Sequence, residues 1–107
     1  MRRRALAAAL CLSACAAAPV APPTPAFAPD AQGIALIGSP LRIDFGRSQD
    51  GVIAAVTRLE ARSPSAATAC PGGGSAVRWP SGLALHFRGG AFLGWAQADG
   101  SSAGIGC

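Results

Sequence analysis

The sequence contains no lysine, no tyrosine and no asparagine, and only 13% of its 107 residues are charged. Without lysine the chain has neither a Schiff-base nucleophile nor the lysine-bearing phosphate loop of nucleotide-binding proteins. Its length allows one small domain, since domains typically run to roughly 100–150 residues, and this excludes a barrel enzyme, a two-domain enzyme and a multi-span membrane protein. Half of the residues are hydrophobic, so the chain does not have the composition of a disordered protein.

The positive charge is concentrated at the N-terminus. The formal net charge is +4, and three arginines follow Met1 directly. From Cys15 onward, six arginines face five acidic residues, which leaves a net charge of +1. The basic isoelectric point therefore indicates a targeting segment, and no nucleic-acid partner is predicted.

Residues 1–14 have the form of a secretory signal peptide, with arginines, the apolar run Ala5–Leu12 and then small residues. The alternative of a transmembrane anchor fails, because the apolar run falls short of the roughly 20 residues that span a bilayer. The segment Leu12-Ser13-Ala14-Cys15 resembles the bacterial lipobox. That resemblance, which covers only this segment, implies that Cys15 becomes the acylated N-terminus of the mature protein.

The residue after the cysteine is Ala16, and the aspartate that retains such lipoproteins in the inner membrane is absent. The resemblance thus implies an outer-membrane lipoprotein, anchored in the inner leaflet and facing the periplasm, with the lipid bilayer as its first partner. The alternative is ordinary signal peptidase cleavage after Ala18 or Ala28. Proline follows each of these positions, and it fixes the backbone next to the bond that would be cut.

Residues 15–32 comprise the lipidated cysteine and an Ala/Pro-rich stretch with five prolines. Such a stretch favours extended polyproline II and cannot build a core, so we expect a semi-rigid tether. A proline-rich ligand for an SH3-like groove is the alternative, but no flanking arginine orients the motif. Residues 33–107 then form the small periplasmic domain.

Two cysteines remain for that domain once Cys11 is removed with the signal and Cys15 carries lipid. In an oxidising compartment, Cys70 and Cys107 are expected to form a disulfide. The alternative is a reactive thiol or a metal ligand. His86 is the single histidine of the sequence, which leaves too few ligands for a zinc site. We therefore predict neither a metal nor a cofactor.

The apolar pattern predicts an α+β fold. Residues 34–37 and 41–45 indicate a hairpin, the second run alternating apolar and polar residues from Leu41 to Phe45. A helix should follow, with Ser48 as N-cap, apolar residues at 52, 56 and 59, and Pro64 as its limit. Residues 76–79, 83–88 and 91–97 indicate a three-strand meander. The predicted domain is one small antiparallel sheet with the helix packed on one face.

No catalytic constellation is predicted. One Gly-x-Ser-x-Gly match occurs, at Gly100–Gly104, but no helix pattern follows it as a nucleophile elbow requires. Alternation in residues 83–88 places His86 on the polar, solvated face of the sheet. The carboxylates show no motif spacing, and the dinucleotide fingerprint is absent. A hydrolase that uses His86 stays open only as a third function class.

A partner surface could lie on the meander, where tryptophan and arginine, which are frequent at interaction hot spots, occur together. The candidates are Trp79, Trp95, Arg78 and Arg88. Alternation places Trp95 and Leu93 on one face, opposite Phe92. The alternative is that both tryptophans fill the core of a domain with few aromatic residues.

The runs LRIDFGRSQDGVIAAVTRLE and VRWPSGLALHFRGGAFLGW, between Leu41 and Trp95, resemble a group of short bacterial lipoproteins of unknown role. Some members are described as aspartate-semialdehyde dehydrogenase, an activity that this short chain without a nucleotide site does not support. The helix-then-meander order is similar to that of BamE-type outer-membrane assembly lipoproteins, a likeness of architecture. The expected function is a lipid-anchored periplasmic binding or envelope-assembly module without catalytic activity; the alternative is a small inhibitor of an envelope-attacking hydrolase.

Overall fold

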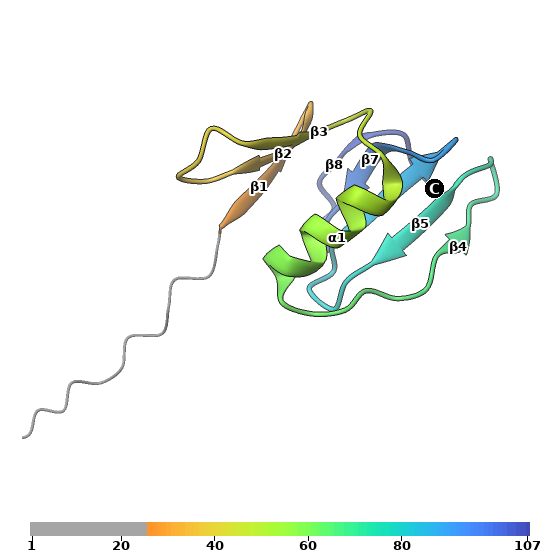
Figure 1. Cartoon of the computed structure of the whole chain (residues 1–107). Coiled ribbons are helices and arrows are strands. Elements are labelled where there is room, and N and C mark those ends of the chain that lie inside the picture. Colours follow the sequence, from red (N-terminus) through yellow and green to blue (C-terminus); the bar gives the residue numbers. More distant parts are fainter. Residues whose placement is uncertain (1–25) are drawn as a thin grey trace, which may run out of the picture.

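The computed structural model describes residues 26–107 (Figure 1). The predicted signal peptide, Cys15 and the tether as far as residue 25 lie outside the described residues. Within the described part, one α-helix and eight strands form two antiparallel sheets, which confirms the predicted α+β class. No helix in residues 26–107 is both long enough and apolar enough to cross a membrane.

The smaller sheet has three strands in the order β1 (Phe27–Asp30), β2 (Gly33–Leu36) and β3 (Arg42–Asp44). Strands β2 and β3 form the predicted hairpin, but β1 lies in the stretch assigned to the tether, so that the tether prediction is wrong for residues 27–32. Pro29 does not prevent this strand, because β1 is an edge strand and proline is tolerated where one side of a strand is unpaired.

The helix α1 (Gln49–Glu60) buries Val52 and Val56, as its apolar spacing predicts. Ser48 stands at the N-cap position in an extended conformation, but its side chain makes no capping bond. The N–H of Gln49 instead donates a 2.8 Å hydrogen bond to the carbonyl of Gly90, in the turn of the larger sheet. The helix ends at Ala61, which has a left-handed conformation with φ 56°, before Pro64 is reached.

The larger sheet has five strands in chain order: β4 (Thr68–Ala69), β5 (Ser75–Arg78), β6 (Ala84–Arg88), β7 (Ala91–Ala96) and β8 (Ser102–Gly104). Its three central strands are the predicted meander. The two-residue turn between β6 and β7 needs glycine, because Gly89 and Gly90 both have positive φ. The short edge strands β4 and β8 are too brief to show a periodic pattern in the sequence.

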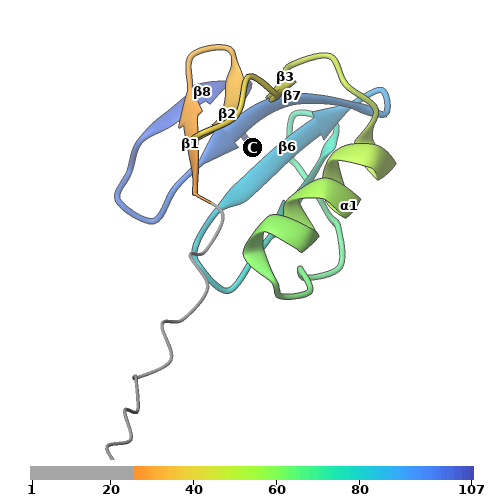
Figure 2. The ribbon, with the colours of Figure 1, turned by 60° about the vertical axis from the view of Figure 1, so that its left-hand side comes forward.

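The helix and the three-stranded sheet lie side by side on one face of the five-stranded sheet (Figure 2). The chain therefore forms two sheets where one was predicted. The side chains between these layers make a single core of Ile34, Ile43, Val52, Val56, Val77, Trp79, Leu83, Leu85, Phe87, Phe92 and Trp95.

A β-bulge changes which side chains of β7 share a face. Leu85 pairs with Trp95 and Phe87 pairs with Phe92, and the register shifts between His86 and Phe87. One residue of β7, Leu93, is left without a cross-strand partner, so strict alternation fails there. Because paired residues lie on the same face, Phe92 and Trp95 both point into the core. The prediction that they lie on opposite faces is wrong.

Candidate functional site

The predicted partner surface is not formed by the tryptophans. Trp79 is 3% exposed and Trp95 is 5% exposed, so both fill the core. Arg78 and Arg88 are exposed, but each is the last residue of its strand, and β5 and β6 are antiparallel. The two arginines therefore lie at opposite ends of the sheet, and the four candidate residues do not make one surface.

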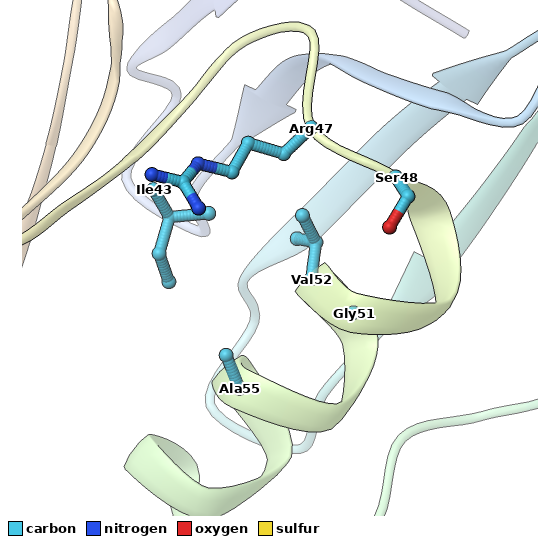
Figure 3. Close-up of a pocket in the computed structure, with 6 residues that line it drawn as sticks. All are labelled: Ile43, Arg47, Ser48, Gly51, Val52 and Ala55. Carbon is cyan, nitrogen blue, oxygen red and sulfur yellow. The ribbon is translucent and has the colours of Figure 1, made fainter.

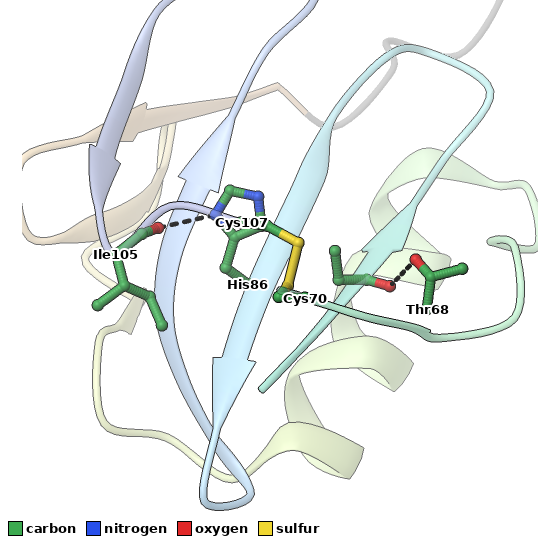
Figure 4. Close-up of a disulfide and its surroundings, with 6 residues drawn as sticks. Thr68, Cys70, His86, Ile105 and Cys107 are labelled. Atoms are coloured by element: carbon green, nitrogen blue, oxygen red, sulfur yellow. Dashed lines mark hydrogen bonds between the residues drawn. A yellow bond between two sulfur atoms is a disulfide. The ribbon is translucent and has the colours of Figure 1, made fainter. Parts of the chain in front are cut away.

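His86 is buried, with 5% of its surface exposed, so the prediction of a solvated histidine is wrong. Alternation does place it on the face of β6 away from Leu85 and Phe87, but that face is covered. The Nδ1 atom lies 2.7 Å from the carbonyl oxygen of Ile105 (Figure 4). A carbonyl only accepts, so Nδ1 carries the proton and donates it, which fixes the ring orientation.

The cover is the C-terminal strap, residues 105–107. Cys107 forms a disulfide with Cys70, with an S–S distance of 2.05 Å, and this is the pairing that the cysteine count predicts (Figure 4). Between β8 and Cys107 the strap passes directly over β7, where a Cβ on Gly94 would overlap the backbone of Ile105. The imidazole of His86, the bare backbone at Gly94 and the disulfide thus hold the strap against the sheet.

Arg42 forms the centre of an ion-pair cluster on the smaller sheet. Its guanidinium donates to both carboxylate oxygens of Asp30, at 2.9 and 2.8 Å, and to Asp44 at 2.7 Å. The hydrogen bond from Arg42 holds the pKa of Asp30 below its ordinary value, and the same bond raises the pKa of Arg42. The charge of Arg42 is therefore compensated by two carboxylates. In residues 26–107, no three His, Cys, Asp or Glu side chains gather as metal ligands would.

The described surface contains a groove between the helix and the hairpin, which we call the α1–β3 groove. Figure 3 shows one half of it, where Arg47 extends from the loop before α1 towards Ile43. The second half shares Ile43, Arg47 and Ala55 with the first and continues towards the end of the helix. The residues that line the second half are Leu36, Leu41, Arg42, Ile43, Arg47, Ala55, Arg58 and Leu59.

The groove was not predicted, and Leu41 shows why. Alternation in residues 41–45 assigned Leu41 to the buried face of a strand, but β3 begins at Arg42 and Leu41 is 67% exposed. The turn residues Gly38-Ser39-Pro40, immediately before it, are the sequence signal that could have placed Leu41 in a loop. Arg47 precedes α1 and Arg58 lies in its last turn, so the helix places both on the side that faces the hairpin.

The chain matches no protein-family model, no curated protein and no solved structure.

Proposed function

We propose that this chain is a lipid-anchored periplasmic module without catalytic activity, which serves a binding partner or an envelope assembly. The observation that carries the proposal is the disulfide between Cys70 and Cys107. Disulfides persist in oxidising compartments such as the periplasm, and small secreted domains use them to supplement a small core. The lipobox-like segment Leu12–Cys15 supports the same compartment by an independent route.

In this proposal Cys15 is the mature N-terminus and carries the acyl chains. Each buried methylene contributes about 0.8 kcal/mol to membrane binding, so two or three chains anchor the protein stably. Ala16 after the cysteine favours the outer membrane, with the domain facing the periplasm from the inner leaflet.

A non-catalytic role is supported by the environment of His86. Its Nδ1 is occupied by the carbonyl of Ile105, and the ring is covered by the C-terminal strap. A general base must reach a proton of the substrate directly or through one water, and a covered ring is a poor candidate. His86 is better explained as the residue that holds the strap.

The test is metabolic labelling with a fatty-acid probe in a bacterium that processes lipoproteins. The parent protein should be labelled and the Cys15→Ser variant should not. Cys11→Ser is the matched control, because this cysteine lies within the signal and outside the lipobox; it should be labelled like the parent. Equal labelling of the parent and Cys15→Ser, or no labelling of either, would overturn the anchor.

The two candidate roles differ in the partner. Affinity capture from solubilised membranes should recover barrel-assembly components if the module serves envelope assembly. Recovery of a cell-wall or membrane hydrolase would instead favour the alternative, a small inhibitor, for which a disulfide-braced sheet provides the required rigidity.

A further inference from the structure

Two large apolar side chains are exposed in the described part of the chain, and both lie in one loop. Ile37 is 63% exposed and Leu41 is 67% exposed, and they are the first and last residues of the loop between β2 and β3. We call residues 37–41 the hairpin tip. The tip is an ordered turn: the N–H of Ser39 donates to the carbonyl of Leu36 at 3.2 Å, and the N–H of Leu41 donates to Oγ of Ser39 at 3.1 Å. The backbone thus holds both side chains in solvent.

The hairpin tip lies beside the point where the chain enters the described structure. The N–H of Ile37 donates a 2.9 Å hydrogen bond to the carbonyl of Ala26, the first described residue. Figure 1 shows the loop between β2 and β3 next to the start of β1. Ten residues separate Ala26 from Cys15. Their fully extended length limits the tip to within roughly 40 Å of an anchor at Cys15.

The α1–β3 groove continues from the tip, and within residues 26–107 it carries positive charge that no carboxylate pairs. Leu41 belongs both to the tip and to the groove, and the groove is also lined by Arg47 and Arg58. No carboxylate lines this part of the groove, and Arg42, its third arginine, is already paired with Asp30 and Asp44. An apolar projection beside guanidinium groups that form no ion pair in the described part of the chain complements a surface that is anionic outside and apolar beneath.

We propose that the hairpin tip docks on the anionic phospholipid bilayer that carries the anchor. Ile37 and Leu41 enter the interface between headgroups and acyl chains, and Arg47 and Arg58 contact lipid phosphates. The proposal rests on the lipid anchor of the proposed function. It adds an orientation: the domain lies on the membrane by its three-stranded sheet, and the five-stranded sheet with its strap faces the periplasm.

The size of the patch favours a bilayer over a protein partner. A stable protein interface buries roughly 800 Å² on each partner, which is more than two side chains provide. A bilayer needs no such area from a tethered protein, because the anchor keeps the local concentration of lipid around the tip high.

The test uses the full lipidated chain in vesicles of phosphatidylglycerol and phosphatidylcholine. With Cys15 acylated and Cys70 bonded to Cys107, an Ile37→Cys variant has one free thiol for a polarity-sensitive fluorophore. Thr68→Cys is the matched control, because Thr68 is exposed on the edge strand β4, three strands away from β7, the strand that contacts the smaller sheet (Figure 1). Urea unfolding of each labelled variant verifies that the domain is folded.

Brominated acyl chains should quench the label at position 37 several times more strongly than the label at position 68. The difference should shrink in vesicles of phosphatidylcholine alone and in the Arg47→Gln/Arg58→Gln variant. Equal quenching at the two positions in vesicles that carry the protein would overturn the docking and leave the anchor intact. A protein that does not float with the vesicles would refute the anchor and the docking together. A label shielded in native membranes but unquenched by lipid would assign the tip to a protein partner and contradict the proposal.

Discussion

The indole Nε1 of Trp95 donates a 2.8 Å hydrogen bond to the backbone carbonyl of Asp30, which joins the two sheets across 65 residues of sequence. Asp30 ends the edge strand β1, and its carboxylate is at the same time paired with Arg42. Trp95 is buried against this strand on the covered face of the larger sheet. The first described strand, β1, is therefore fixed to the larger sheet by this side chain, in addition to its pairing with β2.

Trp95→Phe should destabilise the domain more than Trp79→Phe. The two substitutions remove the same atoms from equally buried sites, but Nε1 of Trp79 has no hydrogen-bond partner in the described structure. Loss of the Trp95 bond removes a part-buried hydrogen bond to the carbonyl of Asp30 and should cost about 0.5–1.5 kcal/mol beyond the loss of packing. Urea unfolding of both variants measures the difference, and equal destabilisation would show that the bond contributes nothing.

Removal of the disulfide should lower the free energy of unfolding by about 3–4 kcal/mol, because the bond closes a loop across 37 residues of sequence. The Cys70→Ser/Cys107→Ser variant and the reduced parent should unfold at the same urea concentration. The parent without reductant should unfold at a clearly higher one. If reduction leaves the midpoint unchanged, the bond does not constrain the unfolded chain.

The strap requires glycine at position 94. A Cβ there would overlap the backbone of Ile105, whereas a Cβ on Gly72 would meet nothing within 4 Å. Gly94→Ala should therefore displace the strap and cost about 1–3 kcal/mol or more, and Gly72→Ala should be nearly neutral. Hydrogen exchange should show faster exchange in the strap for Gly94→Ala alone. Unchanged exchange in that variant would mean that the strap does not lie against β7.

Acid should weaken the attachment of β1. The hydrogen bond from Arg42 lowers the pKa of Asp30 below its ordinary value of 3.8, so the unfolded chain binds this proton more readily than the folded one. The ionised Asp30 stabilises the fold fully at a pH above its pKa in the unfolded chain. This stabilisation is lost as the pH falls through its lower pKa in the folded protein. The side chain of Ser101 also lowers the pKa of Asp99, so acid should remove the stabilisation from this carboxylate as well.

Urea unfolding at a series of pH values from about 5 downward tests this linkage. The Asp30→Asn variant should lose less stability on acidification than the parent does, and Arg42→Gln should behave in the same way because it removes the cause of the shift. A parent whose stability is independent of pH over this range would contradict the linkage.

Much of the fold could be predicted because local signals agree with the tertiary structure. The spacing of Val52 and Val56 gives the helix, and Gly89-Gly90 gives the turn between β6 and β7. The failures have tertiary causes. Proline at position 29 is typical of a tether, but an edge strand accepts it. The extra residue in β7, Leu93, shifts the alternation of its side chains between the two faces of the sheet. No pattern in the sequence signals this bulge.

The candidate site was less predictable than the fold. Alternation in its strand predicts a solvated His86, but the strap that covers it comes from residues 105–107, far along the sequence. Trp79 and Trp95 are candidates for a partner surface or for the core, and their burial confirms the core. The hairpin tip and the arginines of the α1–β3 groove depend on contacts between segments that composition and spacing do not reveal. The disulfide, in contrast, could be predicted from the number of cysteines that remain in the domain.

Mass spectrometry of the mature protein, extracted from membranes without reductant, tests the central claim most directly. We expect a chain that begins at Cys15, with diacylglycerol on its sulfur and a mass lower by two hydrogens for the bond between Cys70 and Cys107. A mature chain with an unmodified Cys15, or one that begins further along the sequence, would contradict the account.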